Sequence, residues 1–206
     1  MRCFLVSADY PQRHPLLMPV PPLGIALLAS VLLRDGHEVQ AEDQFASRAS
    51  NEDLADRILA FDPHLVGIGM LTPSVPTGTA LAGLLRRRGY RGVIAMGNIH
   101  ATLFADDLLA AGACNVVVRG EGEQTLSELA AAIASGRPFD DIAGLSWRDP
   151  AGGIRRNPDR AQRDRLDELP VPAWHLFDLR SYSSAPMLQL RGRALPIQAS
   201  RGCPER

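Results

Sequence analysis

The chain has 206 residues, of which 46% are hydrophobic and 22% charged, with a formal net charge of -1. This composition is typical of a globular protein, and the length suits one large domain, or one domain with an appendage. Because the charge is nearly balanced, no overall field favours nucleic acid or an anionic membrane, and we expect neither as a partner.

The N-terminus lacks the pattern of a signal peptide, because Arg2 leads straight into an apolar strand, and we expect a cytoplasmic protein. Residues 16–33 form a long apolar run that Pro19, Pro21 and Pro22 interrupt. The helix that remains has about a dozen residues, fewer than the ~20 that cross a bilayer. We therefore interpret it as a buried crossover helix and expect no membrane span.

Five short apolar runs alternate with helical patterns over the first two thirds of the chain. The expected strands are residues 3–6, 37–41, 65–69, 93–96 and 116–118. The expected helices are residues 22–34, 52–61, 76–88, 105–111 and 123–134. Strands and helices in strict alternation, joined by short loops, predict an α/β domain with a doubly wound, five-stranded parallel sheet and helices on both faces.

The helix ends carry local signals. Pro22 suits the first helical position, where a missing N–H costs nothing. Asn51 is expected to cap the helix over 52–61. Three arginines and then Gly89 end the helix over 76–88, which suits its negative end and a glycine cap.

The pattern changes after residue 136. Residues 143–147 and 154–156 flank a glycine-rich turn and predict a β-hairpin. Residues 157–186 have weak periodicity and four prolines, and predict a linker that packs on another part of the chain. Residues 187–190 and 195–199 are expected to pair as strands, the second of which would open another domain.

In parallel α/β sheets, ligands bind outside the carboxyl ends of the strands, so four loops are candidates for chemistry. In the first, residues 21–24, backbone amides at a helix start could meet a ligand, or simply begin the helix. In the second, residues 70–76, the hydroxyls of Thr72 and Ser74 could face a ligand or cap the next helix.

The third loop, residues 97–102, contains Gly97, which permits close backbone approach, and His100. His100 could bind a ligand, ligate a metal or fix the loop; without partners at metal-ligand spacing, we favour a role in the loop or pocket wall. The fourth loop, residues 119–123, places two glycines between a strand and a helix. The alternative there is a tight turn, with Glu123 in the first turn of the helix.

The three cysteines are widely spaced, which argues against a disulfide framework. Cys3 and Cys114 lie in or beside apolar runs and are expected as small core residues. Cys203 differs, because it follows an apolar run and the sequence Ser200-Arg201-Gly202.

Taken in order, PPLG, GxxHAT, RGEGE, a β-hairpin, PxPAW and ASRGC resemble the cobalamin-binding radical S-adenosylmethionine (SAM) family along nearly the whole chain. The resemblance implies a Rossmann-like (flavodoxin-like) cobalamin-binding domain over residues 1–136. A hairpin and linker would follow over 137–186, and the start of a radical SAM partial TIM barrel over 187–206. Cys203 would be the first of three thiolate ligands of a 4Fe-4S cluster in a CxxxCxxC loop, so we expect the front part of a longer enzyme.

By the same resemblance, the corrinoid lies over the carboxyl ends of the strands, against the four loops. The cofactor contacts that the resemblance implies are Pro22, Leu23, Gly24, Thr72, Ser74, Gly97, His100, Gly120, Glu121 and Gly122. The third loop departs from the family's usual GGPHAT, because this chain has Gly97-Asn98-Ile99-His100-Ala101-Thr102.

Residues 62–67 match the DxHxxG pattern with which methionine-synthase-like proteins supply a lower axial histidine to cobalt. Here the pattern precedes the third strand, at the amino end of the sheet, whereas the corrinoid site is expected at the carboxyl end. We therefore predict that His64 does not ligate cobalt.

The resemblance implies a reduced cluster that cleaves SAM to a radical, and methylcobalamin that gives a methyl group to a substrate radical. Cyclisation or rearrangement remains an alternative, no catalytic residue is identified, and the small-molecule substrate is unknown. The barrel would act in cis, so we expect this piece alone to be inactive.

The competing hypothesis is a non-catalytic ligand-binding or regulatory module without cobalamin. A phosphorylated receiver would need carboxylates after the first and third strands, but only Asp9 is suitably placed. An enzyme using a nucleotide, with Asp43 as a ribose ligand, would need a GxGxxG turn that the first strand lacks.

Overall fold

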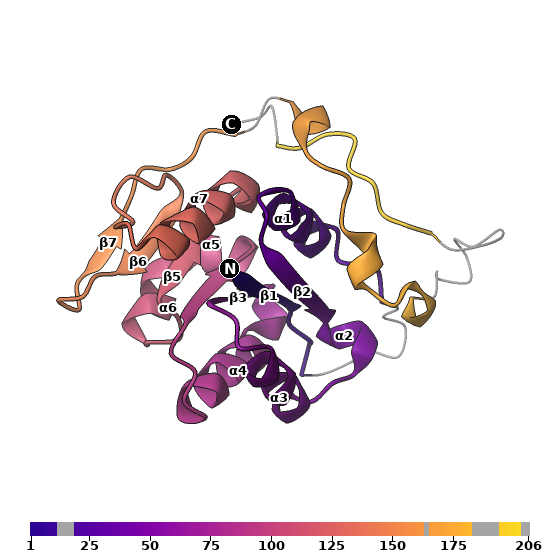
Figure 1. The fold of residues 1–206 in the computed structure, drawn as a ribbon, viewed down its shortest axis with the longest axis horizontal. Coiled ribbons are helices and arrows are strands. Elements are labelled where there is room, and N and C mark those ends of the chain that lie inside the picture. The colour runs from indigo at the N-terminus through magenta and orange to yellow at the C-terminus, as the bar shows by residue number, and fades with distance from the viewer. Residues whose placement is uncertain (12–18, 163–164, 183–193, 203–206) are drawn as a thin grey trace.

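The computed structural model describes residues 1–11, 19–162, 165–182 and 194–202 (Figure 1). The strands are β1 (Arg2–Ser7), β2 (Glu38–Asp43), β3 (Leu65–Gly69), β4 (Val93–Gly97), β5 (Val116–Val118), β6 (Leu145–Arg148) and β7 (Ile154–Arg156). The α-helices are α1 (Leu23–Arg34), α2 (Gln44–Ser47), α3 (Asn51–Phe61), α4 (Val75–Arg87), α5 (Ile99–Leu103), α6 (Ala105–Ala110) and α7 (Gly122–Ser135). Single 3-10 turns lie at Thr72–Ser74, Leu166–Glu168, Trp174–Leu176 and Leu179–Ser181.

The strands form one sheet in the order β2-β1-β3-β4-β5-β6-β7. The first five run parallel, and their order, 2-1-3-4-5, is that of flavodoxin-like folds, which confirms the expected α/β class. The hairpin β6–β7 was expected as a separate element. It instead extends the same sheet, because β6 pairs antiparallel with β5 and covers an edge that would otherwise be unpaired.

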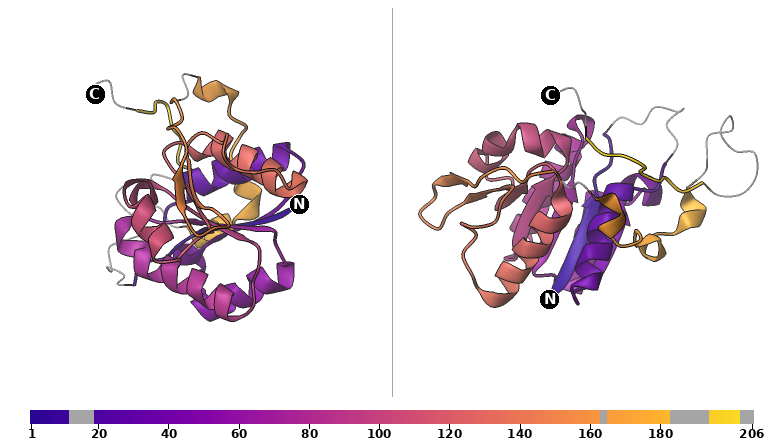
Figure 2. Two further views of the ribbon diagram at one scale, coloured as in Figure 1. Left: turned by 90° about the vertical axis from the view of Figure 1, so that its left-hand side faces the viewer. Right: turned by 90° about the horizontal axis from the view of Figure 1, so that it is seen from above.

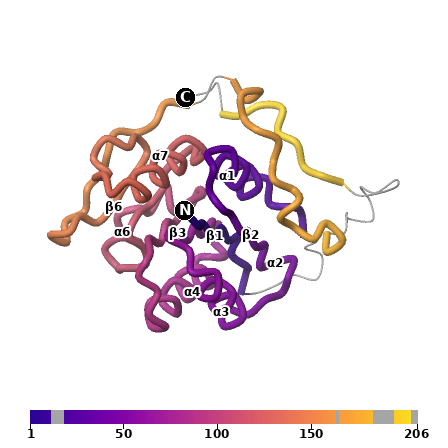
Figure 3. The backbone as a smooth tube through the Cα atoms, viewed as in Figure 1, coloured from indigo at the N-terminus to yellow at the C-terminus, as the bar shows by residue number. Residues whose placement is uncertain are grey.

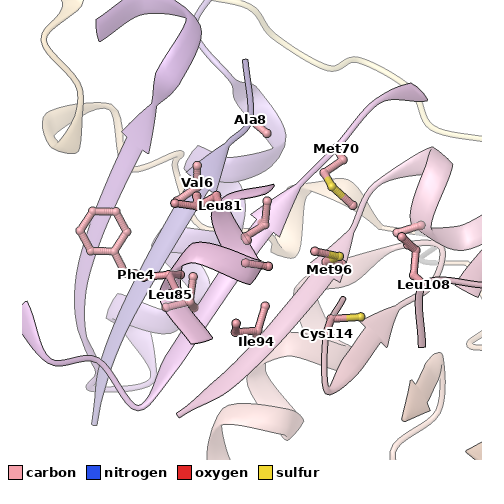
Figure 4. Packing of buried hydrophobic residues seen from close by; sticks show 14 of the residues in the cluster. Phe4, Val6, Ala8, Met70, Leu81, Leu85, Ile94, Met96, Leu108 and Cys114 are labelled. Carbon is pink, nitrogen blue, oxygen red and sulfur yellow. The ribbon is translucent and has the colours of Figure 1, made fainter. Parts of the chain in front are cut away.

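Helices cover both faces of the sheet (Figures 1 and 2). Helices α1 and α7 pack together on one face, and α3 and α4 on the other. Figure 4 shows the packing between the sheet and helices α3 and α4. Val6, Ile94 and Met96 of the strands face Leu81 and Leu85 of α4, and all five are essentially inaccessible to solvent. Burying a side chain of this size contributes about 1.5–3 kcal/mol, so this layer holds the strands in place.

Helices α1, α3, α4 and α7 each begin one residue from the expected position, and the caps of α1 and α3 show why. Helix α1 begins at Leu23, and Pro22 takes the capping position, where its carbonyl oxygen accepts from Ala26 N at 2.9 Å. The cap of α3 is Ser50, whose Oγ accepts from Asp53 N at 3.1 Å in a capping box. Asn51 turns away, because its Nδ2 donates to Thr77 O at 3.1 Å and ties α3 to α4.

The segment after the hairpin packs on the side of the domain that α1 and α7 cover. Figure 3 shows residues 165–182 running down beside α1 toward α2. Ala173 and Phe177 are buried there, and Ala173 N donates to Ala26 O at 3.0 Å. The expectation that this linker packs on another part of the chain is confirmed.

The two expected C-terminal strands have different outcomes. Residues 187–190 lie outside the described residues. Residues 195–199 are described and form no strand, so that expectation is wrong. An isolated strand needs a paired neighbour to satisfy its backbone groups, and this segment instead crosses the end of the domain. Among the described residues, no helix combines the length and apolarity needed to cross a bilayer.

Candidate functional site

The carboxyl ends of the central strands meet at one edge of the sheet. The strand register aligns Ser7 of β1 with Gly69 of β3, and Gly69 with Gly97 of β4. A cavity of about 590 Å³ opens above this row, between the first turns of α1 and α7. The site therefore lies where parallel α/β sheets bind their ligands.

Glycines form much of the floor of this cavity. A Cβ atom placed on Gly24 would meet no atom within 4 Å, and on Gly97 would come no closer than 3.6 Å to Val118 O. The backbone is not left-handed at Gly24 or Gly97, and a Cβ atom would fit at both positions. Neither backbone conformation nor packing therefore requires glycine there. Gly24 also weakens α1 by up to about 1 kcal/mol relative to alanine. Bare backbone at these positions suits a large flat ligand that approaches the main chain closely.

Two other glycines have structural reasons of their own. Gly120 has a φ of 66°, a left-handed conformation that favours glycine. At Gly122 a Cβ would lie 3.2 Å from Leu28 Cδ2, so glycine lets α7 approach α1.

Seven of the ten sequence-predicted contacts line the cavity. They are Pro22, Leu23, Gly24, Gly97, Gly120, Glu121 and Gly122. Thr72 and His100 lie at the same edge but outside the lining, and their side chains contact each other, with Nδ1 of His100 3.2 Å from Oγ1 of Thr72. Ser74 is buried at the N-cap position of α4, but its side chain makes no capping hydrogen bond to that helix. Its Oγ instead accepts from Leu71 N at 3.0 Å and shapes the turn before α4.

The third loop forms a short helix, α5, that the sequence did not predict. The ring of His100, in this helix, stacks on the ring of Phe104, the residue that follows α5, with the ring centroids 4.6 Å apart. Together with the contact to Thr72, this stacking fixes His100 as part of the loop, the role that the sequence favoured. Thr102 joins two loops, because its Oγ1 accepts from Gly120 N at 3.0 Å and donates to Asn98 O at 3.1 Å.

Asn98 replaces a glycine of the family pattern and lines the cavity. Its φ of 79° and ψ of -176° lie in a region that is almost exclusive to glycine, at a cost of about 1–3 kcal/mol. Its own Oδ1 accepts from Ile99 N at 2.7 Å, which offsets part of that cost and starts α5. The sequence pattern did not reveal this strained position in the cavity lining.

Two lining residues come from the far end of the chain. Gln198 and Arg201 close one side of the cavity, and Arg201 pairs with Glu123 and Glu121. The sequence placed Glu123 only in the first turn of a helix. It could not indicate that the partner lies 78 residues further on.

His64 lies at the opposite edge of the sheet, immediately before β3. Its Nδ1 accepts from Arg2 N at 3.2 Å, and its backbone N donates to Arg2 O at 2.9 Å. The imidazole ring therefore binds backbone at the amino end of the sheet, whereas the cavity lies at the carboxyl end.

Two of the three cysteines lie in the hydrophobic core. Cys3 and Cys114 are buried free thiols, as expected, and burial raises the pKa of Cys3 to about 11 and of Cys114 to about 12. They are thus unreactive core residues. In the part of the chain that the structure describes, no group of three or more histidine, cysteine or acidic side chains could hold a metal. Cys203 lies outside the described residues.

The carboxylate of Asp43 already has hydrogen-bond partners within the fold. Its carboxylate is buried, accepts from Phe45 N at 3.2 Å, and is hydrogen-bonded to the side chain of Tyr182. Burial raises its pKa to about 6, with a smaller contribution from Asp9, although these hydrogen bonds act in the opposite direction. A carboxylate committed in this way cannot serve as the ribose ligand of a nucleotide enzyme.

The strand order and the glycine-floored cavity at the carboxyl edge define a flavodoxin-like ligand-binding domain. A family model, the B12 binding domain, matches residues 15–130, more than half of the chain. The chain belongs to the B12-binding domain family. The predicted cobalamin-binding domain is thereby confirmed, and a module without cobalamin does not fit.

Curated relatives carry related names. The chain is 34% identical over 188 residues to the "uncharacterized methyltransferase PH0819" of Pyrococcus horikoshii, covering 89% of this chain and 39% of that protein. It is 32% identical to an anaerobic magnesium-protoporphyrin IX monomethyl ester cyclase of Synechocystis sp., covering 90% of this chain and 36% of the relative. The chain thus spans less than two fifths of the length of these relatives.

Solved structures share the fold. The cobalamin-dependent SAM radical enzyme OxsB, with aqua-cobalamin and SAM bound, has a TM-score of 0.73 at 19% identity, covering 84% of this chain and 24% of OxsB. The radical SAM methyltransferase TsrM from Kitasatospora setae has a TM-score of 0.63 at 25% identity, covering 76% of this chain and 30% of TsrM.

Proposed function

We propose that the chain is the corrinoid-binding region of a radical SAM enzyme, with cobalamin in the cavity at the carboxyl edge of the sheet. The observation that carries the proposal is the open glycine floor in a chain of the B12-binding family. Gly24 and Gly97 would lie under the ligand, and the first turn of α1 would present Pro22 and Leu23 to it. The turn at Gly120 would lie along the ligand's polar edge, held in place by the hydrogen bond from Gly120 N to Thr102 Oγ1.

The remaining predicted contacts belong to this proposal in different roles. Glu121 and Gly122 line the cavity at the start of α7. Thr72 and His100 stand outside the lining, where they could contact a ligand larger than the cavity itself. Ser74 supports the turn that presents Thr72.

The chemistry of the whole protein is proposed from its relatives. When bound, methylcobalamin supplies a methyl group for transfer to a substrate. The relatives' names include methyltransferases and ring-forming cyclases, so methyl transfer or a related bond-forming reaction is proposed. A 4Fe-4S cluster, with Cys203 as one ligand, and SAM would be held by a barrel that follows residues 187–206.

The proposed domain limits are residues 1–136 for the cofactor domain and 137–186 for the hairpin and linker. The hairpin extends the sheet of the cofactor domain, so these two parts share one core. A cytoplasmic location is part of the proposal, because the buried thiols of Cys3 and Cys114 are unpaired, as is usual in a reducing compartment.

Corrinoid retention tests the proposal. The purified chain is mixed with hydroxocobalamin and passed through a gel-filtration column, and the absorption of the protein peak is recorded. We expect about one corrinoid per chain, held by the apolar and backbone surfaces of the cavity. Absence of retention with and without a reductant would contradict the proposal.

Replacing His64 by alanine is expected to leave the spectra of the bound corrinoid unchanged, because the ring lies at the edge of the sheet opposite the cavity. The measurement is the UV-visible spectrum of the loaded chain and the EPR spectrum of its cob(II)alamin form. His100→Ala, at the cavity edge, provides the comparison. A nitrogen-coupled cobalt signal that disappears only in His64→Ala would refute the prediction.

A further inference from the structure

An ion-pair cluster joins the last described segment of the chain to the fourth loop. The guanidinium of Arg201 donates to both carboxylate oxygens of Glu123, from Nη1 at 3.1 Å and from Nη2 at 2.8 Å. Glu121 Oε2 lies 3.5 Å from Nη1 of the same arginine. The three side chains are only 16%, 7% and 17% exposed for Arg201, Glu123 and Glu121.

This cluster is more than a solvated surface pair. A carboxylate as enclosed as that of Glu123 loses most of its hydration, and the loss is offset only by a partner with good geometry. The planar guanidinium provides two parallel hydrogen bonds, which a lysine ammonium cannot reproduce. The cluster therefore fixes the position of Arg201 relative to the loop that follows β5.

Arg201 also organises the wall of the cavity. Its Nη2 donates to Gln198 Oε1 at 3.0 Å, and both residues line the cavity. Figure 2 shows residues 194–202, in yellow, crossing the carboxyl side of the sheet next to α1. The segment thus lies across one side of the site, and Arg201 connects it to the opposite wall at Glu121 and Glu123.

We propose that Arg201 is a positioning residue that latches residues 194–202 across the corrinoid site and slows the escape of the ligand. The inference rests on the proposed function. Arg201 stands two residues before Cys203 in the sequence, so the same latch fixes where the predicted cluster loop begins relative to the cavity. One ion-pair cluster would then set the placement of the two cofactors.

The test compares the rates at which corrinoid dissociates from variants of the 206-residue chain. Hydroxocobalamin-loaded protein is mixed with excess labelled cobalamin, and exchange is followed after rapid filtration. We expect dissociation to be ~10-fold faster in Arg201→Met, corresponding to ~1.4 kcal/mol, and intermediate in Arg201→Lys. Arg180→Met is the matched control, because Arg180 pairs locally with Asp178 on the exposed linker.

Two further variants keep the test informative if Arg201→Met folds poorly. Glu123→Gln combined with Arg201→Met removes both charges of the closer pair, so the most enclosed carboxylate, that of Glu123, is not left without a partner, and this variant should also release corrinoid faster. The reciprocal swap of Glu123→Arg with Arg201→Glu should restore slow dissociation in part. Recovery by the swap identifies the pairing itself, which a general loss of stability would not produce.

Trypsin cleavage tests the contact without any corrinoid. Cleavage after Arg201 should be slow in the unaltered chain, because the guanidinium is only 16% exposed and is paired with Glu123, and it should be faster in Glu123→Gln. Equal dissociation rates in the unaltered chain and all variants would overturn the latch and leave the proposed function standing. An unaltered chain that retains no corrinoid would instead overturn the proposed function, and with it the role of the latch.

Discussion

Gly97→Leu is expected to abolish corrinoid retention while the domain stays folded. Gly97 is the last residue of β4 and lines the cavity floor. A Cβ atom added to Gly97 would lie 3.6 Å from Val118 O, its nearest neighbour. Alanine fits there at ordinary contact distance, but the longer branches of leucine must extend into the cavity. We expect Kd for hydroxocobalamin to rise at least ~100-fold, a loss of ~3 kcal/mol, with a smaller loss in Gly97→Ala.

Gly83 offers the matched control. It lies in α4, outside the cavity lining, and an added Cβ would meet only the mobile end of Arg87, at 3.3 Å. Gly83→Ala should leave Kd unchanged and stabilise the helix by up to ~1 kcal/mol. Binding is measured by absorption titration, and circular dichroism reports the fold. Unchanged binding in a folded Gly97→Leu variant would contradict the placement of the ligand.

Stability should fall as the pH rises through the range in which Asp43 ionises. The unfolded chain loses this proton near the usual pKa of 3.8, whereas the folded chain keeps it until about 6, because burial disfavours the charged form. The folded state therefore binds more protons between these values, and stability decreases with pH across that window by ~3 kcal/mol in total. From about pH 5 to about pH 7.5 the expected loss is ~1.4 kcal/mol.

Asp43→Asn should flatten this dependence, because an amide does not ionise but still accepts from the backbone at Phe45. Burial lowers the pKa of His37, which acts in the opposite direction, but His37 is the same in both proteins and cancels in the comparison. Urea unfolding at several pH values gives the free energies. Parallel curves for the two proteins would show that Asp43 makes no such contribution.

Local sequence patterns predicted most of the fold, because the apolar runs and the glycine and proline residues between them coincide with the strands, helices and loops of the structure. The limits of β3 and β5 match the expected residues, since buried parallel strands appear as continuous apolar runs. The cap of α3 was assigned to Asn51 instead of Ser50, because both residue types cap helices and only tertiary contacts separate them. The hairpin's place at the sheet edge also depends on pairing between distant strands.

The site was predictable to the extent that topology places it. Loops after parallel strands must gather at one edge, so Gly24, Gly97 and Gly120 could be grouped before any coordinates were known. Gln198 and Arg201 could not, since nothing local shows that a segment 78 residues after Glu123 returns to it. The signal that could have found Arg201 is the pair of acidic residues in RGEGE, which need a cation once enclosed.

Hydrogen exchange of the chain with and without hydroxocobalamin tests the location of the ligand most directly. The account predicts new protection at the residues of three loops that line the cavity and carry amide hydrogens: Leu23 and Gly24, Gly97 and Asn98, and residues 120–123. Residues around His64, at the amino edge, should exchange at the same rate in both samples. Protection at the amino edge, or none in the three loops despite bound corrinoid, would contradict it.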